Sequence, residues 1–310
     1  MKDLNKKILF VGGKGGVGKS TSASAIAWTL AQKKERTLLV STDPAHNLSH
    51  IFLQQIGSDI TKVTNYLSAL EIDPEVETDQ YIKDVKDNIS GIVQASMHEE
   101  VDRQLDTARA SPGAAEAALF DKLISIILEE SSEFDKLIFD TAPTGHTIRL
   151  LSLPELMGVW IEGLLKKRKQ TNENYSRLLH DGEPVEDSIY DVLKQRQQRF
   201  EKARQILLNR QETSFVFVLN PERLPILETK KAIELLSTYD LHVSTVIINK
   251  VLPEDVGGEF FRQRQRHEQT YLKMIDDTFK DQQLIYVPLF PHDISSKGEL
   301  ETFSQYFSKE

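Results

Sequence analysis

The sequence predicts an α/β protein whose core is a doubly wound, mostly parallel sheet. Short, nearly all-apolar runs recur along the chain, and segments with helical spacing separate them. Runs that are apolar at almost every position indicate strands covered on both faces, which is typical of a parallel sheet. A glycine-rich turn joins the first run to the first expected helix, and this strand–turn–helix unit anchors the rest of the prediction.

The expected strands follow one another at intervals long enough to hold a helix. The first run begins at Ile8, and a helix of about four turns made mostly of small residues leads to the second run at 37–41. The later runs have the same apolar character; they are 136–140, 214–219, 244–248 and 284–289, with a shorter candidate at 70–74. We therefore expect one domain over residues 1–310 that is built on this sheet.

Two segments lack strand-like runs and carry helical periodicity instead, from about residue 78 to 131 and from about 154 to 210. We expect them to assemble into one inserted, all-helical subdomain. In the second segment we expect a later helix around 190–207 and, before it, one apolar face made by Met157, Trp160, Ile161, Leu164 and Leu165. Apolar residues at steps of three and four line one stripe of the first segment: Ile82, Val85, Ile89, Val93, Met97, Val101 and Leu105. The stripe can pack helices on one another, or it can form a face that binds a partner or client protein.

Composition excludes several classes of function. The formal net charge is −9 and no dense basic tract is present, so we expect no nucleic-acid partner. The basic cluster Lys166 to Lys169 fits a solvated helix end or, alternatively, contact with an anionic surface. The chain has no cysteine, which excludes disulfides and thiolate metal sites. No apolar run approaches the roughly 20 residues that span a bilayer, so a cytoplasmic location is expected.

The glycine-rich turn fits a phosphate-binding loop, with the spacing Gly13-x-x-x-x-Gly18-Lys19-Ser20. Glycines let consecutive backbone N–H groups turn toward phosphate oxygens without Cβ clashes. Lys19 is expected at the β- and γ-phosphates of ATP, and the Ser20 hydroxyl is expected to bind Mg²⁺. A flexible glycine loop is the plain alternative, but the apolar run before the loop and the helix after it supply the context of a P-loop.

Lys14 is a second lysine inside the loop, and the loop's own nucleotide does not need it. The pattern resembles the deviant Walker A loop of the ParA, MinD, nitrogenase iron protein and ArsA group. In those families the first lysine crosses a dimer interface to the partner's nucleotide, so the resemblance implies a homodimer. The expected nucleotide-binding residues of the loop are Gly13, Lys14, Gly15, Gly16, Val17, Gly18, Lys19, Ser20 and Thr21.

Polar residues follow several of the expected strands, at the edge of the sheet where ligands bind in parallel α/β folds. Asp140 ends an apolar run and is placed like a Walker B aspartate, so we expect it to hold Mg²⁺. Asp43 follows the second run and is the carboxylate that remains to orient the attacking water. Because an aspartate before a proline is often a turn residue, the residues alone leave the role of Asp43 open.

Four segments closely resemble the ArsA family of arsenical pump-driving ATPases, which includes the cytosolic ATPase that delivers tail-anchored membrane proteins. These segments, spread over the chain in order, are 13–20, 41–49, 71–74 and 140–147. The resemblance implies a nucleotide-dependent homodimer, with Asp43 as the catalytic aspartate of a first switch. Residues 140–147 would form a second switch that relays the nucleotide state to the helical subdomain.

The same resemblance assigns further residues around the nucleotide. Asn249 falls at the family's adenine-contacting asparagine, and Glu222 falls at a glutamate near the nucleotide at the dimer interface. Pro288 and Leu289 precede the loop that closes over the base. Without the resemblance, an ordinary turn residue at Asn249 and an ordinary surface residue at Glu222 would be the leading interpretations.

The chain departs from the family where a metal or metalloid would bind. Arg262 and Gln265 stand where tail-anchor-targeting members carry a zinc-binding Cys-x-x-Cys, so this chain cannot form a zinc clamp. It also has no cysteine thiolates to hold arsenite, and only Met97 and Met157 lie in the helical insertions, whereas family client grooves are methionine-rich.

Three functions are compatible with these residues. The first is an ATP-hydrolysing dimeric switch that binds a hydrophobic segment of a partner, such as a membrane-protein tail, with only indirect membrane association. The second is an ATPase subunit that energises an arsenite or other anion efflux pump. The third is a MinD- or ParA-like positioning ATPase; the short ending over 302–310 lacks the amphipathic membrane helix that such a protein needs.

Overall fold

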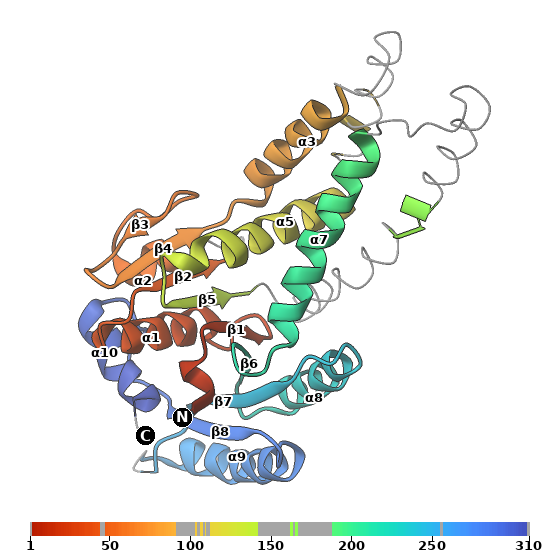
Figure 1. The fold of residues 1–310 in the computed structure, drawn as a ribbon. Helices are drawn as coiled ribbons and strands as arrows, with labels where there is room; N and C mark the ends of the chain where they lie inside the picture. Colours follow the sequence, from red (N-terminus) through yellow and green to blue (C-terminus); the bar gives the residue numbers. More distant parts are fainter. Residues whose placement is uncertain are drawn as a thin grey trace, which may run out of the picture. The chain divides into compact units, whose positions relative to one another are not determined.

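The computed structural model describes residues 2–43, 47–90, 103, 106, 107, 109, 112–141, 162, 163, 165, 166, 188–254 and 257–308. The chain divides into two compact units (Figure 1). The first, here the sheet unit, comprises Met1–Asp73, Glu129–Arg149 and Leu207–Glu310. The second, here the helical unit, comprises Pro74–Leu128 and Leu150–Ile206.

One eight-stranded sheet runs through the sheet unit in the order β3-β4-β2-β5-β1-β6-β7-β8. All neighbouring strands are parallel except the edge pair β3 and β4. The strands are β1 Ile8–Gly13, β2 Thr37–Ser41, β3 Thr61–Lys62, β4 Leu67–Glu71, β5 Lys136–Asp140, β6 Thr213–Leu219, β7 Val243–Val251 and β8 Gln283–Pro288. This sheet confirms the predicted α/β class with a mostly parallel sheet.

The strand expected at 70–74 was placed too late in the chain. The strand is β4, Leu67–Glu71, and Pro74 instead begins helix α3, Pro74–Ser90. Proline lacks an N–H but tolerates the first helical turn, where that donor has no helical partner. The short antiparallel strand β3 was not expected, because two residues carry no readable alternation.

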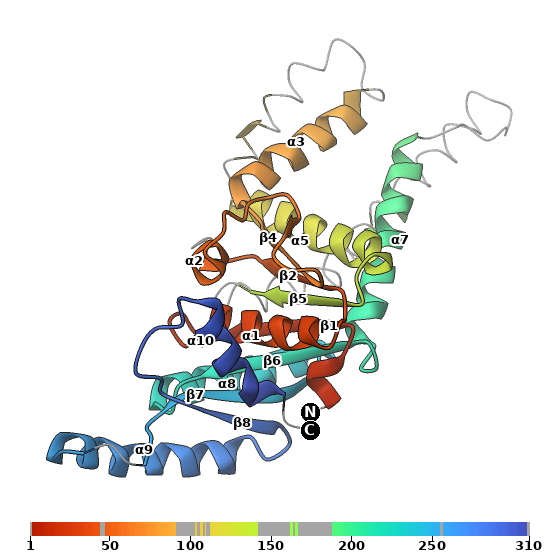
Figure 2. The same ribbon diagram turned by 90° about the vertical axis from the view of Figure 1, so that its left-hand side faces the viewer.

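Helices cover both faces of the sheet, which makes the fold doubly wound (Figure 2). Side chains of α1, α2 and α10 share one apolar cluster with Val216, Val218 and Ile247 of the strands. Those of α8 and α9 share another with Leu219 and Val246. The helices are α1 Lys19–Gln32, α2 Asn47–Phe52, α8 Arg223–Ser237, α9 Glu259–Thr278 and α10 Lys297–Ser304, with short 3₁₀ segments at Lys2–Asn5, Glu130–Ser132 and Gln305–Phe307.

Three stacked phenylalanine rings hold the central strands in register. The Phe10 ring on β1 stacks on that of Phe139 on β5, with ring centroids 4.7 Å apart, and on that of Phe215 on β6 at 5.2 Å. Each such pair contributes about 0.5–1.5 kcal/mol beyond area burial. The same register sets Val11 opposite Asp140 and Gly13 opposite Val218. The end of β1 is therefore fixed between the ends of β5 and β6.

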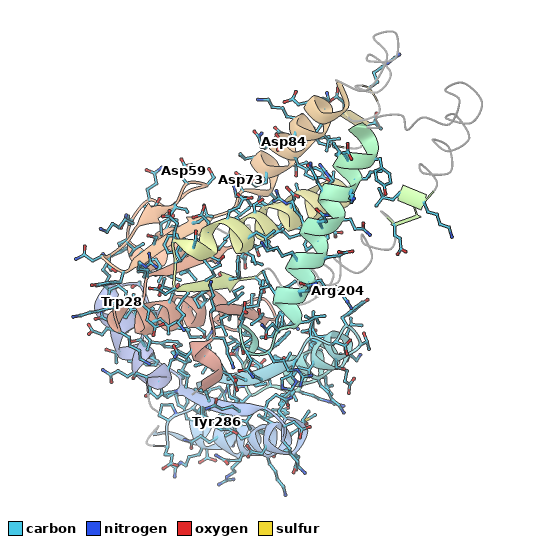
Figure 3. The ribbon with its side chains drawn as sticks, viewed as in Figure 1. Trp28, Asp59, Asp73, Asp84, Arg204 and Tyr286 are labelled. Carbon is cyan, nitrogen blue, oxygen red and sulfur yellow. The ribbon has the colours of Figure 1, made fainter. Side chains whose placement is uncertain are left out.

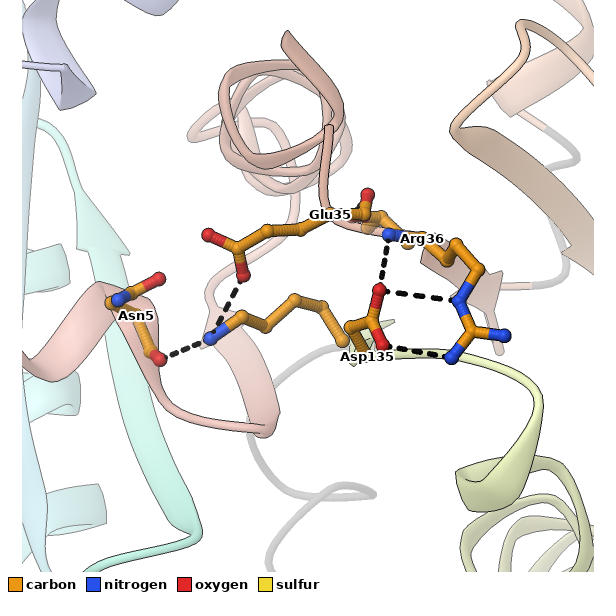
Figure 4. A network of polar contacts seen from close by, with 6 residues as sticks. Asn5, Glu35, Arg36 and Asp135 are labelled. Carbon is orange, nitrogen blue, oxygen red and sulfur yellow. Dashed lines mark hydrogen bonds and ion pairs between the residues drawn. The ribbon is translucent and has the colours of Figure 1, made fainter. Parts of the chain in front are cut away.

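A polar network lies at the start of β5, at the end of the strand opposite Asp140 (Figure 4). Arg36 binds Asp135 through two side-chain hydrogen bonds of 2.9 and 3.2 Å and a backbone N–H bond of 2.8 Å. These hydrogen bonds hold the pKa of the Asp135 carboxyl below its usual value. Lys136 pairs with Glu35 at 3.1 Å and donates to the carbonyl of Asn5. The network ties the connection before β2 to the start of β5.

Trp28 and Tyr286 lie where helices pack against the sheet (Figure 3). Trp28 is buried on α1, whose small residues Ala23, Ala25 and Ala27 are completely buried and let the helix lie close to the strands. Tyr286 of β8 donates a hydrogen bond to Asp276 of α9. Burial and the neighbouring Asp276 carboxylate raise the pKa of the Tyr286 hydroxyl.

The described part of the helical unit consists mainly of α3, α5 (Pro112–Glu129) and α7 (Ser188–Leu208). The Phe120 and Phe200 rings join α5 to α7 with centroids 5.5 Å apart, and Lys122 pairs with Glu77 of α3 at 2.9 Å. The helix expected around 190–207 is confirmed as α7. None of the described helices combines the length and apolar character that crossing a bilayer requires.

Some of the predicted apolar positions cannot be followed further. The part of the 82–105 stripe between residues 91 and 102, and its last residue Leu105, lie outside the described residues. Met157, Trp160, Ile161 and Leu164 also lie outside them, whereas Leu165 is described and buried.

Candidate functional site

The glycine-rich turn has a conformation that glycine alone allows at two positions. At Gly13, where β1 ends, a Cβ would lie 2.3 Å from the carbonyl oxygen of Val218 on β6. Gly18 precedes α1 in the left-handed region, with φ 94°, and a Cβ there would lie 2.3 Å from Nδ2 of Asn249. α1 then begins at Lys19 without a side-chain cap, so its first backbone N–H groups are available to an anion.

The two lysines of the loop have different partners. Lys19 is only 5% exposed, and its Nζ donates to the backbone carbonyl of Lys14 at 3.3 Å, across the turn. The Lys14 side chain is partly exposed, and its Nζ lies 3.2 Å from Oε1 of Glu228 on α8. The ammonium of Lys19 therefore stays with its own loop, while that of Lys14 leaves it.

Asp140 is completely buried at the end of β5 beside the loop. Ser41 donates to its Oδ2 at 3.4 Å, whereas its Oδ1 has no hydrogen-bond partner among the described residues. Burial raises the pKa of the Asp140 carboxyl to about 7; a hydrogen bond from Ser20 and the charge of Lys19 lower it, and the charge of Asp43 raises it. The structure thus brings these predicted residues into one polar cluster.

Backbone bonds fix the segment that carries Asp43. The N–H of Thr42 donates to the carbonyl of Asp140 at 2.9 Å, and the N–H of Asp43 donates to Oγ of Ser41 at 3.3 Å. Residues 44–46 lie outside the described part, and so do residues 142–147 of the expected second switch. Asn47 begins α2, and its Nδ2 lies 3.5 Å from Oγ of Ser20. Asn47 is a residue of this cluster that was not among the predicted site residues.

Glu71 is a second residue whose place the sequence did not reveal. Its carboxylate is 2% exposed and accepts bonds from the backbone N–H of Leu48 at 2.7 Å and the hydroxyl of Ser49 at 3.0 Å. It thereby stabilises the first turn of α2, where a negative charge is favourable. The available signal was a buried acidic residue at the end of the mostly apolar strand β4.

Two residues near the end of β7 hold the glycine-rich loop through hydrogen bonds to its carbonyl groups. Asn249 is buried, its Nδ2 donates to the carbonyl of Val17 at 2.8 Å, and its Oδ1 accepts from the N–H of Lys250 at 2.9 Å. Lys250 has a left-handed backbone with φ 59°, and its Nζ donates to the carbonyl of Gly16 at 3.3 Å. Asn249 therefore lies beside the loop, and its described contacts position the loop. Lys250 was not predicted.

Two of the remaining predicted residues line a cavity of about 680 Å³ within the sheet unit. Glu222 lies on its wall and pairs with Arg264 of α9 at 3.7 Å, in a largely exposed position. Leu289 follows Pro288, the last residue of β8, and also lines the cavity, together with Lys250. The size is ordinary for a small-molecule site.

Comparison with known proteins decides the family. The model of the anion-transporting ATPases, ArsA, matches residues 6–309. The chain belongs to the ArsA family of ATPases. It is 34% identical to the putative arsenical pump-driving ATPase 2 of Aquifex aeolicus, over 97% of this chain and 98% of the relative. It is 33% identical to ATPase GET3A of Arabidopsis thaliana, over 97% and 83%, and 34% identical to ATPase GET3 of Kluyveromyces lactis, over 99% and 93%.

Membership of the ArsA family makes the chain a nucleotide-binding enzyme that hydrolyses ATP. This agrees with the geometry, because the loop with its two lysines, the N-terminus of α1 and the buried Asp140 of β5 lie together at the carboxyl ends of the parallel strands. The recognition of the family from the four sequence segments is confirmed by matches that cover nearly the whole chain.

Asp140→Asn is expected to stabilise the nucleotide- and metal-free protein increasingly as the pH rises. The folded-state pKa of about 7 lies above the ordinary aspartate value of 3.8, so ionisation of Asp140 opposes folding progressively from about pH 4 to pH 7. Asparagine cannot ionise. The stability gain of the variant over wild type should grow by about 3 kcal/mol between pH 5 and pH 8.

Urea denaturation in EDTA at the two pH values measures this difference. Asp135→Asn is the control, because the pKa of Asp135 is lowered and its stabilising effect is already present above the unfolded pKa. Its stability difference from wild type should therefore stay the same between pH 5 and pH 8. A gain for Asp140→Asn that does not change with pH would show that the buried carboxyl is not the cause.

Proposed function

We propose that the protein is a homodimeric Mg²⁺-dependent ATPase switch whose helical unit binds an apolar segment of a partner protein. The observation that carries the nucleotide part is the polar cluster at the end of β1, β2 and β5. It gathers a buried lysine, a hydroxyl and two carboxylates around a helix N-terminus, which is what phosphoryl transfer to water requires.

The donor set fits a magnesium ion. Mg²⁺ prefers oxygen ligands, and the hydroxyl of Ser20 and the carboxylate of Asp140 would hold it. Oδ1 of Asp140 is buried without a hydrogen-bond partner among the described residues, as expected for an atom that receives a ligand. The ion would supply positive charge against the phosphate oxygens of the bound nucleotide.

Other residues would bind the phosphates, orient the attacking water and place the nucleoside. Lys19 would exchange the carbonyl of Lys14 for the β- and γ-phosphate oxygens, and the first N–H groups of α1 would bind the same phosphates. Asp43 would orient the attacking water and accept its proton. Asn249, Glu222, Pro288 and Leu289 would place the nucleoside, with Asn249 acting through its hold on Val17.

The position of the Lys14 ammonium is the observation that supports the dimer. Its ammonium is not directed at the site of its own loop, since it lies 3.2 Å from Glu228 of α8. A lysine whose ammonium points away from its own loop can complete the charge around the nucleotide of a second copy, in the way that a trans-acting arginine stabilises the transition state of other nucleotide hydrolases.

The partner-binding role is supported by the helical unit and by the resemblance to the tail-anchor-targeting branch of the family. Relatives named ATPase GET3 and GET3A match this chain over almost its whole length. A membrane-protein tail is the apolar segment that we propose, so contact with a membrane would be indirect, through the client.

A subunit of an anion efflux pump is the second candidate. It is favoured by the anion-transporting ATPase model and by the relative named putative arsenical pump-driving ATPase 2. With no cysteine in the chain, metalloid binding through thiolates is excluded. A pump role would therefore rest on ATP hydrolysis and a membrane partner alone.

The two candidates separate in a capture experiment with the Asp43→Asn variant, which should stay in its ATP-bound form. The variant is incubated in a lysate of its source cells with Mg²⁺ and ATP, and the bound proteins are identified by mass spectrometry. Enrichment of proteins with one C-terminal apolar segment supports targeting. Enrichment of a polytopic permease supports the pump. The same variant in EDTA is the control, and equal recovery there would contradict nucleotide-dependent binding.

A further inference from the structure

The ion pair between Lys14 and Glu228 joins two elements that are far apart in sequence. Lys14 lies in the turn between β1 and α1, and Glu228 lies on the second turn of α8, 214 residues later. Their side-chain atoms Nζ and Oε1 are 3.2 Å apart, and the side chains are 36% and 40% exposed. The contact lies entirely within the sheet unit, so it belongs to a single protomer.

This contact competes with the role proposed for Lys14. The ammonium that lies 3.2 Å from Glu228 is the same group that would contact a phosphate held by a second copy. Bringing that phosphate to Lys14 also brings its negative charge toward the Glu228 carboxylate, so the two anions compete for the one cation. The main chain of Lys14 has a separate task, since its carbonyl accepts from Lys19 within the loop. The side chain can therefore change partner without withdrawing the carbonyl from Lys19.

From this geometry we propose that Glu228 is a positioning residue that holds Lys14 on its own protomer until two ATP-bound copies meet. This inference rests on the proposed trans role of Lys14. Assembly then exchanges the carboxylate of Glu228 for phosphate oxygens of the partner's nucleotide. Glu228 thereby sets the protein concentration at which hydrolysis begins, without touching the nucleotide itself.

The exposure of the pair limits the size of this effect. A partly exposed lysine–glutamate pair shifts an equilibrium by about 1.5-fold to about 5-fold. A symmetric dimer breaks two such pairs, so the two factors multiply to a change of about 2-fold to about 25-fold in the dimer dissociation constant. The pair therefore biases assembly and does not block it.

The test is the dependence of ATPase activity per protomer on protein concentration, measured with saturating Mg²⁺ and ATP. Glu228→Gln keeps the size of the side chain and removes its charge. The concentration of half-maximal activity should fall by about 2-fold to about 25-fold, while the maximal turnover stays within about two-fold of wild type. A merely structural role of Glu228 would not lower that concentration.

Glu234→Gln is the matched control, because it makes the same change on the same helix. Glu234 pairs with Lys230 at 3.9 Å, an exposed contact within α8 that does not involve the loop. This variant should keep the wild-type midpoint. Sedimentation of the Asp43→Asn protein with and without Glu228→Gln, in Mg²⁺ and ATP, should show the same shift in the dimer dissociation constant.

Several outcomes would overturn the inference. One is an unchanged midpoint in Glu228→Gln, and another is activity per protomer that does not depend on concentration in wild type. A third is a loss of maximal turnover in Glu228→Gln, which would place Glu228 in the assembled site. If Lys14→Ala leaves turnover unchanged, the proposed trans role fails instead. In a Lys14→Ala background, Glu228→Gln should no longer shift assembly.

Discussion

Asp43→Asn is expected to lower the rate of ATP hydrolysis by about a hundred-fold or more, while ATP affinity stays within about three-fold of wild type. Asparagine keeps the shape of the side chain but cannot accept the proton of the attacking water. The backbone bond from Asp43 N to Ser41 Oγ, 3.3 Å long, does not depend on the carboxylate, so the segment should keep its place. The loss should therefore appear in kcat.

Steady-state hydrolysis and equilibrium binding of a fluorescent ATP analogue measure the two quantities separately. Asp59→Asn is a suitable control, because it makes the same change at an exposed aspartate in the loop before β3 (Figure 3). Its turnover should equal that of wild type. Unchanged steady-state hydrolysis by Asp43→Asn would remove Asp43 from the catalytic step.

Lys14→Ala is expected to lower turnover by about a hundred-fold or more, with ATP affinity changed only a few-fold. The reason is that Lys14 would meet the nucleotide of the other protomer, where it stabilises charge in the transition state. Lys19→Ala should differ, because a buried lysine in its own loop contributes to binding itself. A loss of affinity by Lys14→Ala equal to that of Lys19→Ala would contradict the trans role.

Mixing two inactive variants tests directly whether Lys14 acts on the nucleotide of the other protomer. Lys14→Ala and Asp43→Asn protomers are each expected to be almost inactive alone. In a mixed dimer, one site combines Asp43 of its own chain with Lys14 of the other and should be active. Random exchange makes half of the dimers mixed, each with one active site of two, so about one quarter of wild-type activity should return. No recovery after exchange would show that Lys14 acts within its own chain.

Local signals made the nucleotide loop and most strands predictable. A parallel strand buried on both faces is apolar at nearly every position, and only a glycine can stand where a Cβ would lie 2.3 Å from a backbone oxygen, as at Gly13. The bounds of β4 were harder to predict. The strand expected at 70–74 is Leu67–Glu71, because Pro74 is the first residue of helix α3 and does not end the strand.

Chemistry along the chain also predicted that Lys19, Ser20, Asp43 and Asp140 belong together. Each follows or ends a parallel strand, and the carboxyl ends of such strands meet at one edge. The residues that support them were harder to find. Glu71, Asn47 and Lys250 act through hydrogen bonds to backbone or hydroxyl groups of other elements, and such contacts leave no periodicity or spacing in the sequence.

The sequence by itself therefore determined the fold class and the family, and it predicted a phosphate site with a second lysine that its own nucleotide would not need. The tertiary structure alone decided where that lysine is held. Lys14 meets Glu228 only because the order β1-β6-β7 brings the loop after β1 next to the helix after β6. A contact across 214 residues depends on strand order and crossover, which local residue preferences do not encode.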